Sequence, residues 1–193
     1  MELKTMIIQF PNWMKELLEN NSLTFPAIED RMRFVLKLAK LNIENKTGGP
    51  FAAAIFDHSN GKLIAPGVNL VTSSGFSTAH AEIMAVMQAQ VQLKNYDLGA
   101  NGLPVCELVS STAPCAMCLG AIPWSGVRSL VCGARDEDAR AVGFDEGAKP
   151  ANWNMELEKR GIKVIVDICR EDAISVLREY IKLGGVIYNG RMG

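Results

Sequence analysis

Two short motifs constrain the fold of this chain more than any other feature, because each places metal-binding side chains at the start of an expected helix. His80 and Glu82 belong to the segment HAE, and Cys115 and Cys118 belong to the segment PCAMC, which begins with Pro114. Proline fits the first turn of a helix, and helical residues three apart project from the same face. A fold that binds one ion with His80, Cys115 and Cys118 must bring two helix starts together.

The chemistry of these three ligands predicts zinc. Unpaired N–H groups at a helix start favour the thiolate forms of Cys115 and Cys118. Two thiolates with the imidazole of His80 suit Zn²⁺ far better than Mg²⁺ or Ca²⁺. Three protein ligands leave one tetrahedral position for water, which is typical of catalytic sites. We therefore expect one catalytic zinc ion per chain.

A structural zinc site and a redox-active dithiol are the alternatives. A structural site needs a fourth ligand, and the other histidine, His58, lies in an expected hairpin turn, where we expect it to be solvated. Cys106, Cys132 and Cys169 lie in apolar segments, so we expect buried, reduced thiols inside strands, away from both helix starts. These placements favour the catalytic site.

Glu82 is the expected proton carrier. It follows His80 by two residues, within the same helical turn. A carboxylate next to a zinc site can accept the proton of an attacking water, because zinc lowers the pKa of bound water to about 7, and can later return that proton. A glutamate at a helix start is by itself more often solvated, and it is the neighbouring ligands that favour catalysis.

Hydrophobic periodicity predicts a hairpin followed by alternating helices and strands. Expected strands cover 51–57, 62–71, 105–111, 127–134 and 163–169, and expected helices cover 30–43, 79–93, a short segment from 115, 155–161 and 171–183. Asp30 is the candidate cap of the first helix, and Ser77 or Thr78 of the second. Pro123 is expected to end the helix of Cys118 early. The rest of 135–160 reads as acidic loop.

This order of elements predicts an α/β fold with three layers, α/β/α, in which helices cover both faces of a mixed five-stranded sheet. Because no repeat or linker divides the chain, we expect residues 1–193 to form a single domain, with a core at about 28–183. The tail, 184–193, is apolar and aromatic, and is expected either to cap the active site or to dock on the core.

Composition and charge disfavour nucleic-acid and membrane partners. The 193 residues are 48% apolar, which supports a core without disulfides, and 20 basic residues nearly balance 21 acidic ones without a basic run. The N-terminus lacks the apolar run and cleavage site of a secretory signal, and no segment approaches the ~20 apolar residues of a membrane span. We therefore expect a cytoplasmic protein.

The motifs resemble a known family. His-x-Glu with Pro-Cys-x-x-Cys is the signature of the cytidine deaminase-like superfamily of zinc deaminases. The likeness extends to the segments 48–55, 67–71, 80–85, 114–131 and 143–147, which together look like the guanine deaminases of bacteria. The resemblance covers most of residues 30–147, and implies hydrolysis of guanine to xanthine and ammonia.

The resemblance also implies roles for individual residues. Asn69 would make a hydrogen bond to the heterocycle, Phe51 would line the pocket, and Trp124 would lie near the base. The backbone at Ala81 and at the helix start of Cys115 would contact the ring and the reacting water. Glu146 would accept hydrogen bonds from the guanine edge, and Tyr188 would cover the pocket. Guanine presents N1–H and an amine as donors, so an acceptor such as Glu146 is chemically required there. Without the resemblance, Phe51 and Trp124 would read as core, and Asn69 and Glu146 as ordinary loop residues.

Three functional alternatives follow. A related enzyme would act on cytosine, a nucleoside or an amino-triazine such as ammeline, because such rings present similar edges. A tRNA adenosine deaminase shares both motifs but usually carries a basic surface. A non-catalytic zinc module is disfavoured by Glu82 and by the missing fourth ligand. The resemblance further implies a homodimer, in which the C-terminal tail covers either its own active site or that of the partner.

Overall fold

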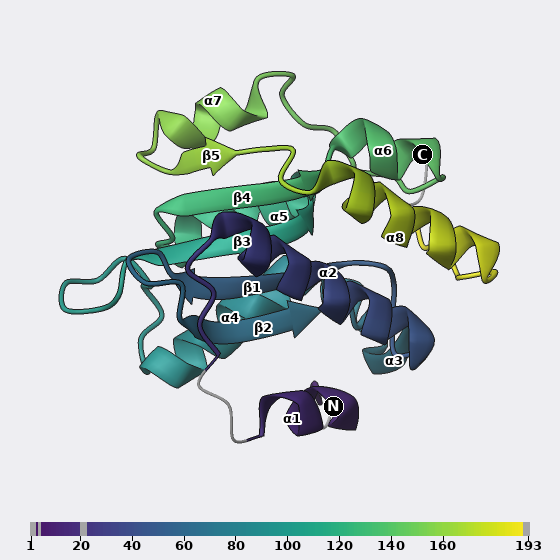
Figure 1. Ribbon diagram of the computed structural model, residues 1–193, viewed down its shortest axis with the longest axis horizontal. Coiled ribbons are helices and arrows are strands. Elements are labelled where there is room, and N and C mark those ends of the chain that lie inside the picture. The colour runs from purple at the N-terminus through teal and green to yellow at the C-terminus, as the bar shows by residue number, and fades with distance from the viewer. Residues whose placement is uncertain (1–2, 4, 20–22, 191–193) are drawn as a thin grey trace.

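The computed structural model describes residue 3, residues 5–19 and residues 23–190, and its centre is a mixed five-stranded sheet (Figure 1). The strands are β1 (Ala52–Asp57), β2 (Leu63–Val68), β3 (Cys106–Thr112), β4 (Ser129–Ala134) and β5 (Lys163–Ile165). They lie in the order β2-β1-β3-β4-β5. Strand β1 is antiparallel to β2 and β3, whereas β4 is parallel to both β3 and β5.

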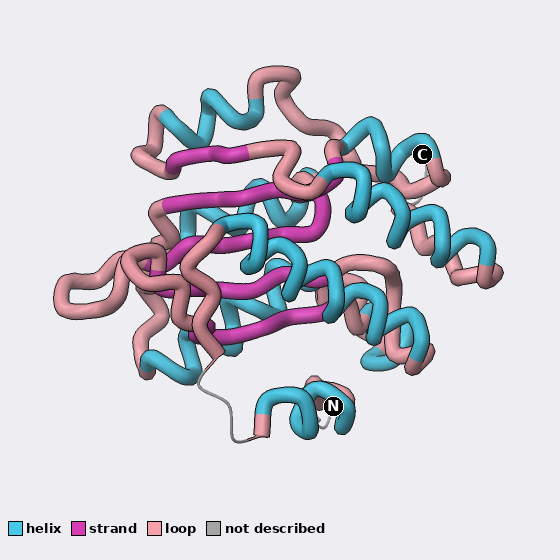
Figure 2. Tube along the Cα trace, in the orientation of Figure 1, coloured by secondary structure: helices cyan, strands magenta, loops and turns pink. Residues whose placement is uncertain are grey.

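Helices cover both faces of this sheet, which confirms the predicted three-layer α/β fold. They are α1 (Asn12–Leu18), α2 (Ile28–Glu44), α3 (Val71–Ser74), α4 (Ala81–Leu93), α5 (Ala116–Ser125), α6 (Asp136–Ala141), α7 (Trp153–Glu158) and α8 (Arg170–Lys182). In Figures 1 and 2, α2 and α8 lie in front of the sheet, and α4 and α5 lie behind it. No helix of the described residues is long and apolar enough to cross a membrane.

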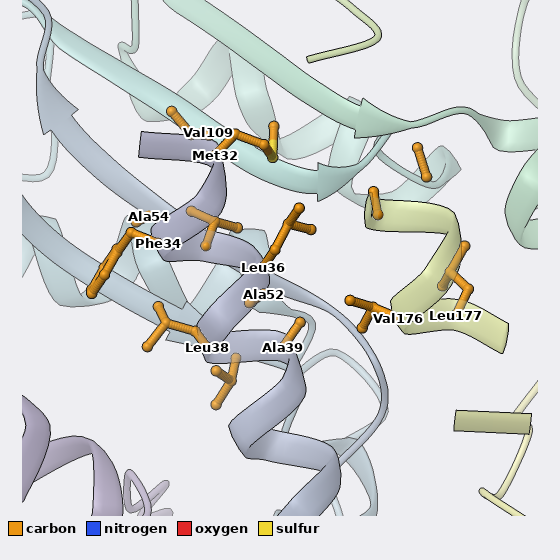
Figure 3. Packing of buried hydrophobic residues seen from close by; sticks show 14 of the residues in the cluster. Met32, Phe34, Leu36, Leu38, Ala39, Ala52, Ala54, Val109, Val176 and Leu177 are labelled. Atoms are coloured by element: carbon orange, nitrogen blue, oxygen red, sulfur yellow. The ribbon is translucent and has the colours of Figure 1, made fainter. Parts of the chain in front are cut away.

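The strands contribute side chains to two hydrophobic layers. On β1, Ala54 and Phe56 belong to the layer under α2 and α8, whereas Ala53 and Ile55 belong to the layer under α4 and α5. This alternation follows from the period of two in a strand. Figure 3 shows the first layer, where Leu36 of α2 lies near residues of the sheet and of α8. Burial of each such large side chain contributes about 1.5–3 kcal/mol.

One edge of the sheet collects the segments that carry the candidate site. Strand β1 begins where β2 and β3 end, because both pairs are antiparallel. Phe51 immediately precedes β1, Asn69 immediately follows β2, and Cys115 follows β3 by three residues. Parallel pairing of β3 with β4 brings the segment after β4 to the same edge. The topology therefore gathers residues that lie far apart in the sequence.

The predicted cap of α2 is wrong. The helix begins at Ile28, with Ala27 as the N-cap, and no side chain caps it. Asp30 lies instead in the first turn, where its Oδ1 accepts a hydrogen bond from Arg33 Nη1 at 2.8 Å. An acidic residue in the first turn stabilises the helix through the macrodipole without acting as a cap.

The predicted caps of α4 are also wrong. Neither Ser77 nor Thr78 occupies the N-cap position, which belongs to His80, with Ala81 as the first helical residue. The chain approaches the helix in an extended conformation at His80, after a turn closed by the hydrogen bond from Ala79 N–H to Phe76 O. The helix start therefore coincides with the ligand itself.

Helix α5 continues through Pro123 and does not end there. Because proline has no N–H, the carbonyl of Leu119 loses the hydrogen bond that it would otherwise accept from position 123. The helix ends two residues later, at Ser125, where Gly126 takes the left-handed conformation (φ 84°) that terminates many helices. The expected early end is therefore wrong by two residues.

The segments around β5 differ from the prediction as well. Strand β5 ends at Ile165, because only three of its residues pair with β4. Cys169 lies outside the strand as the N-cap of α8, with φ 52°, and is partly exposed, whereas Cys106 and Cys132 are buried in strands as expected. Helices α1, α3 and α6 occupy segments that the sequence pattern left as loop. Of the predicted tail, residues 191–193 lie outside the described residues.

Candidate active site

The three predicted zinc ligands lie together at the starts of two helices. His80 is the N-cap of α4, Cys115 is the N-cap of α5, and Cys118 is in the first turn of α5. The Sγ atoms of Cys115 and Cys118 lie 3.5 Å and 3.7 Å from His80 Nδ1, and the candidate ligand atoms all lie within 4.8 Å of one another. The fold thus assembles one cluster from two sequence motifs.

These residues fit a zinc ion. Zinc binds sulfur at about 2.3 Å and imidazole nitrogen at about 2.1 Å. A tetrahedral angle at zinc would therefore place a cysteine Sγ and a histidine nitrogen about 3.6 Å apart. A hydrogen bond from Cys118, together with the nearby His80, lowers the pKa of Cys115 to about 4, while the same hydrogen bond raises the pKa of Cys118. The pair therefore shares one negative charge, and a divalent cation is what makes two thiolates favourable.

Glu82 points into the same cluster from the first turn of α4. The residue is only 8% exposed, and its Oε2 accepts a hydrogen bond from Cys118 Sγ at 3.4 Å. Burial raises the pKa of this carboxyl, because the charged form loses hydration. Glu82 is thus a buried proton acceptor beside the ligands, and not a solvated residue at a helix start.

A pocket opens beside the cluster, and most of the predicted site residues line it. They are Phe51, Asn69, His80, Ala81, Glu82, Cys115, Glu146 and Tyr188. Two further lining residues, Phe144 and Tyr180, escaped the sequence analysis. The ring of Phe144 lies edge-on to that of Phe51, with 4.8 Å between the ring centroids. It stacks with the ring of Tyr180, with 6.1 Å between the centroids. These three rings form an apolar wall suited to a planar heterocycle.

Asn69 presents its amide nitrogen to this pocket. Its Oδ1 accepts hydrogen bonds from the backbone N–H groups of Val71 (3.3 Å) and Gly49 (3.4 Å). Its Nδ2 makes no hydrogen bond to any residue in the described part of the chain. Because the oxygen is occupied by the backbone, the amide is oriented to donate to a ligand.

Glu146 reaches the pocket from the loop between α6 and α7, and is 5% exposed. Burial, followed by the negative charge of Cys115, raises the pKa of Glu146 to about 8. A cation at the ligand cluster and N–H donors on a bound base both favour the ionised carboxylate, because each stabilises negative charge. Glu146 is therefore a buried acceptor whose charge depends on what the pocket holds.

Two hydrogen bonds fasten the loop of Glu146 to the start of α5. The N–H of Ala116 donates to the carbonyl of Glu146, and Lys149 Nζ donates to the carbonyl of Pro114, each at 2.8 Å. Asp136 of α6 pairs with Lys149 at 2.6 Å, which holds this nearly buried cation in place. The acceptor loop and the metal-binding helix are therefore parts of one rigid unit.

The C-terminal tail lies against the pocket of its own chain. Val186 and Tyr188 line the pocket, and Tyr180 Oη donates a hydrogen bond to the carbonyl of Val186 at 2.7 Å. Asn189 accepts a hydrogen bond from the N–H of Asp145 at 2.8 Å. Within a single chain, the tail is thus connected to the loop that carries Glu146.

Trp124 lies away from both the pocket and the ligand cluster. It is 88% exposed and lies in a groove with Pro123 and Trp153. Helix α5 begins at the metal ligands, and a helix rises about 1.5 Å per residue, so the far end of α5 is well removed from them. Trp124 does not line the pocket of its own chain, and its expected place near the base stays a prediction.

His58 also differs from the expectation of a purely solvated residue. Its ring is partly exposed, but Nδ1 lies 3.0 Å from Oε2 of Glu107, a fully buried carboxylate on β3. Glu107 also pairs with Arg31 at 2.6 Å and accepts a hydrogen bond from Ser129 Oγ at 3.1 Å. This network lies at the end of β3 opposite the ligand cluster, so it connects α2 to the sheet without touching the pocket.

Residues 26–134 match the family model of the cytidine and deoxycytidylate deaminase zinc-binding region. Because this match covers more than half of the chain, the protein belongs to that family and is an enzyme of the zinc deaminase class. The ligand cluster and Glu82 lie within the matched region, whereas Glu146 and the C-terminal tail lie beyond it.

Several individual proteins are similar to this chain. A guanine deaminase of Bacillus subtilis is 39% identical over 134 residues, which cover 69% of this chain and 81% of that protein. The structure of a guanine deaminase from Nitrosomonas europaea is 49% identical, with a TM-score of 0.87, covering 91% of this chain and 96% of the other. A tRNA-specific adenosine deaminase of Buchnera aphidicola is 34% identical over 151 residues, 78% of this chain and 91% of that protein.

Proposed function

We propose that the protein hydrolyses guanine to xanthine and ammonia, with one zinc ion per chain. The observation that carries this proposal is the buried carboxylate of Glu146, which lies in the same pocket as the ligand cluster and Glu82. Guanine offers two adjacent donors, N1–H and the 2-amine, and a carboxylate accepts both. The similarity to guanine deaminases from two bacteria agrees with this chemistry.

The residues of the pocket divide the reaction among them. His80, Cys115 and Cys118 would hold the zinc ion, which would lower the pKa of a bound water and so supply a nucleophile at neutral pH. Glu82 accepts one proton of the attacking water and transfers it to the ring nitrogen, and then carries the second proton from the hydroxyl on the attacked carbon to the departing amine. The mass balance is guanine plus water giving xanthine plus ammonia. A glutamate serves this relay because burial raises its pKa toward the working pH.

Substrate recognition uses the remaining pocket residues. Asn69 donates from Nδ2 to an acceptor on the ring, Glu146 accepts from the opposite edge, and Phe51 contacts the face of the base. The backbone N–H of Ala81 lies at the positive start of α4, where negative charge develops in the transition state. Tyr188 covers the open side of the pocket. A site built from buried polar groups discriminates strongly, because a ring that lacks their partners leaves them unpaired.

The alternatives make different demands on the pocket. Cytosine, nucleosides and ammeline would fit with small side-chain changes, so only turnover separates them from guanine. For tRNA, the net charge of −1 argues against binding of a phosphate backbone, although a tRNA-specific deaminase is among the relatives.

We also propose a cytoplasmic homodimer. Helix α5 is apolar on its outer face as well as toward the sheet, and α4 adds two exposed apolar side chains between its glutamines. Exposed apolar residues there are Met87 (48%), Val91 (70%), Met117 (37%) and Trp124 (88%). A helix that is apolar all round is normally buried, so a second copy is the expected cover. Light scattering is expected to give about twice the chain mass of 21.0 kDa, and a monomer at micromolar concentration would contradict it.

The decisive experiment measures ammonia release from the zinc-loaded protein with guanine, adenine, cytosine, guanosine, cytidine and ammeline. We expect guanine to have the highest kcat/KM. A different best substrate would refute the guanine assignment while leaving the roles of the ligands and Glu82 intact. No release from any ring, with zinc bound, would refute deamination of small heterocycles and favour the RNA substrate, which a tRNA anticodon stem-loop would then test.

A further inference from the structure

A fully buried asparagine lies behind the pocket, near the end of α2. Asn42 is 0% exposed, and its Nδ2 donates hydrogen bonds to two backbone carbonyls, those of Gly49 and Asn69, both at 2.9 Å. Its side chain therefore joins the segment before β1 to the segment after β2. A Cβ at Gly48 would overlap the carbonyl oxygen of Asn69, so the two segments are in the closest possible contact.

Two further residues extend this connection to the N-terminal helix. Thr47 Oγ1 donates to Oδ1 of Asn42 at 2.6 Å, and the indole Nε1 of Trp13 donates to Thr47 Oγ1 at 3.1 Å. Trp13, Thr47 and Asn42 thus form a continuous series of hydrogen bonds in which the side-chain polar atoms have partners, as buried networks require. Trp13 belongs to α1, which lies beside the edge strand β2 in Figure 1.

The chain of hydrogen bonds ends on the residue that faces the pocket. Asn42 holds the main chain of Asn69, while Gly49 N–H and Val71 N–H hold its side-chain oxygen. With both ends held, Nδ2 is left without a partner among the described residues, and Asn69 lines the pocket. Asn42 itself does not line the pocket, so it acts through the two lining residues that it holds, Asn69 and Gly49.

We propose that Asn42, Thr47 and Trp13 are positioning residues that set the direction of the Asn69 amide, and thereby the affinity of the enzyme for its base. The inference rests on the proposed function, since Asn69 must contact the substrate. It predicts that a change in α1 alters substrate binding without altering the ligand cluster, because none of the three residues touches His80, Cys115 or Cys118.

Thr47→Val is the most informative variant, because it keeps the shape of the side chain and removes the hydroxyl that links Trp13 to Asn42. We expect KM to rise about tenfold, as for the loss of one buried hydrogen bond, with kcat within about twofold and zinc content unchanged. Thr47→Ser keeps the hydroxyl and is expected to restore KM. Trp13→Phe, which removes the indole N–H together with part of the ring, is expected to change KM in the same direction by a smaller factor.

A double-mutant cycle separates positioning from loss of stability. In an Asn69→Ala background, Thr47→Val is expected to leave kcat/KM unchanged, since the group that it positions is gone. The matched control is Asn45→Ala at the C-cap of α2. The Asn45 side chain donates to Leu41 O in the last turn of that helix, and its loss is expected to leave KM at the wild-type value. The melting temperature of each variant is measured in parallel.

The outcomes are distinguishable. An unchanged KM in Thr47→Val, or an equal effect with and without Asn69, refutes the positioning role. If Thr47→Val does not fold, the same cycle with Trp13→Phe decides the question. Failure of the wild-type enzyme to act on guanine refutes the proposed function only, and the cycle is then measured with the best substrate of the panel.

Discussion

Replacement of Glu146 by glutamine tests the central feature of the proposed recognition. Glu146→Gln keeps the size and burial of the side chain but replaces one of the two acceptor oxygens by an NH₂ group. Guanine would then present a donor to a donor at one of its two contacts. The surroundings cannot relieve this conflict with water, because the residue is only 5% exposed and its main chain is held by Ala116 N–H at 2.8 Å.

The magnitude follows from the hydrogen bonds lost. One hydrogen bond to a charged acceptor contributes about 1.5–3 kcal/mol, and an unpaired buried donor costs about 1–3 kcal/mol more. The sum, about 2.5–6 kcal/mol, corresponds to a decrease in kcat/KM of about two to four orders of magnitude, since 1.36 kcal/mol is tenfold. Because Glu146 is nearly buried, solvent screening reduces this loss of binding free energy only slightly.

The assay is initial-rate ammonia release from zinc-loaded enzyme, with zinc content and melting temperature of the variant measured beside it. Glu137→Gln is a suitable control, because Glu137 is an exposed residue on the outer side of α6 and does not line the pocket. A decrease smaller than threefold in Glu146→Gln, with zinc bound and the fold intact, would refute the reading of the guanine edge by Glu146.

Other expected outcomes concern the ligands, the loop and the surface charges. Glu82→Gln is expected to keep fold and zinc but to lower kcat by about 10²–10⁴, because the proton carrier is gone, and a rate near that of the wild type would contradict the mechanism. Cys115→Ala is expected to lose zinc and to melt at a lower temperature, as is wild type treated with a chelator, and a metal-free protein that melts at the wild-type temperature would contradict a shared ion. Lys149→Met is expected to raise KM for guanine severalfold, because the Pro114 carbonyl loses its partner, whereas the exposed Lys159→Met serves as the neutral control. The hydrogen bond from Arg170 lowers the pKa of Asp138, so this pair stabilises the fold above the unfolded pKa of about 3.9 and its contribution is lost as the pH falls through the lower folded value. Below about pH 5, the melting temperature is therefore expected to decrease more steeply with falling pH for wild type than for Arg170→Ala. Parallel plots of melting temperature against pH would rule out the contribution of this pair.

Local sequence patterns predicted the layers of the fold correctly, because hydrophobic period and turn residues act over a few neighbours. The five strands and the helices of Cys118 and Glu82 were all recognised. The boundaries were less predictable. The N-cap of α4 is His80 because the approaching chain is held by a turn at Phe76, and the serine and threonine before it find no role as caps. Strand β5 is short because pairing with β4 extends over three residues only.

The metal ligands were predictable for a chemical reason. His80, Cys115 and Cys118 have few uses at such spacing, and helix geometry alone places two of them on one face. Their assembly into one cluster needs the sheet, in which β1 begins where β2 and β3 end. The distance of Trp124 from the pocket of its own chain could not be predicted, because a motif says nothing about the length of the helix that separates one of its residues from the site.

The sequence by itself determined the class of fold and the zinc deaminase family, and it predicts the ion and the proton carrier, because these follow from residue types and short spacings. Only the tertiary structure decided how the pocket is supported. The contacts of Asn42 with Gly49 and Asn69, and of Lys149 with Pro114, join segments separated by 7 to 35 positions. The direction of each hydrogen bond depends on where the folded chain brings its partners, and no local pattern records that.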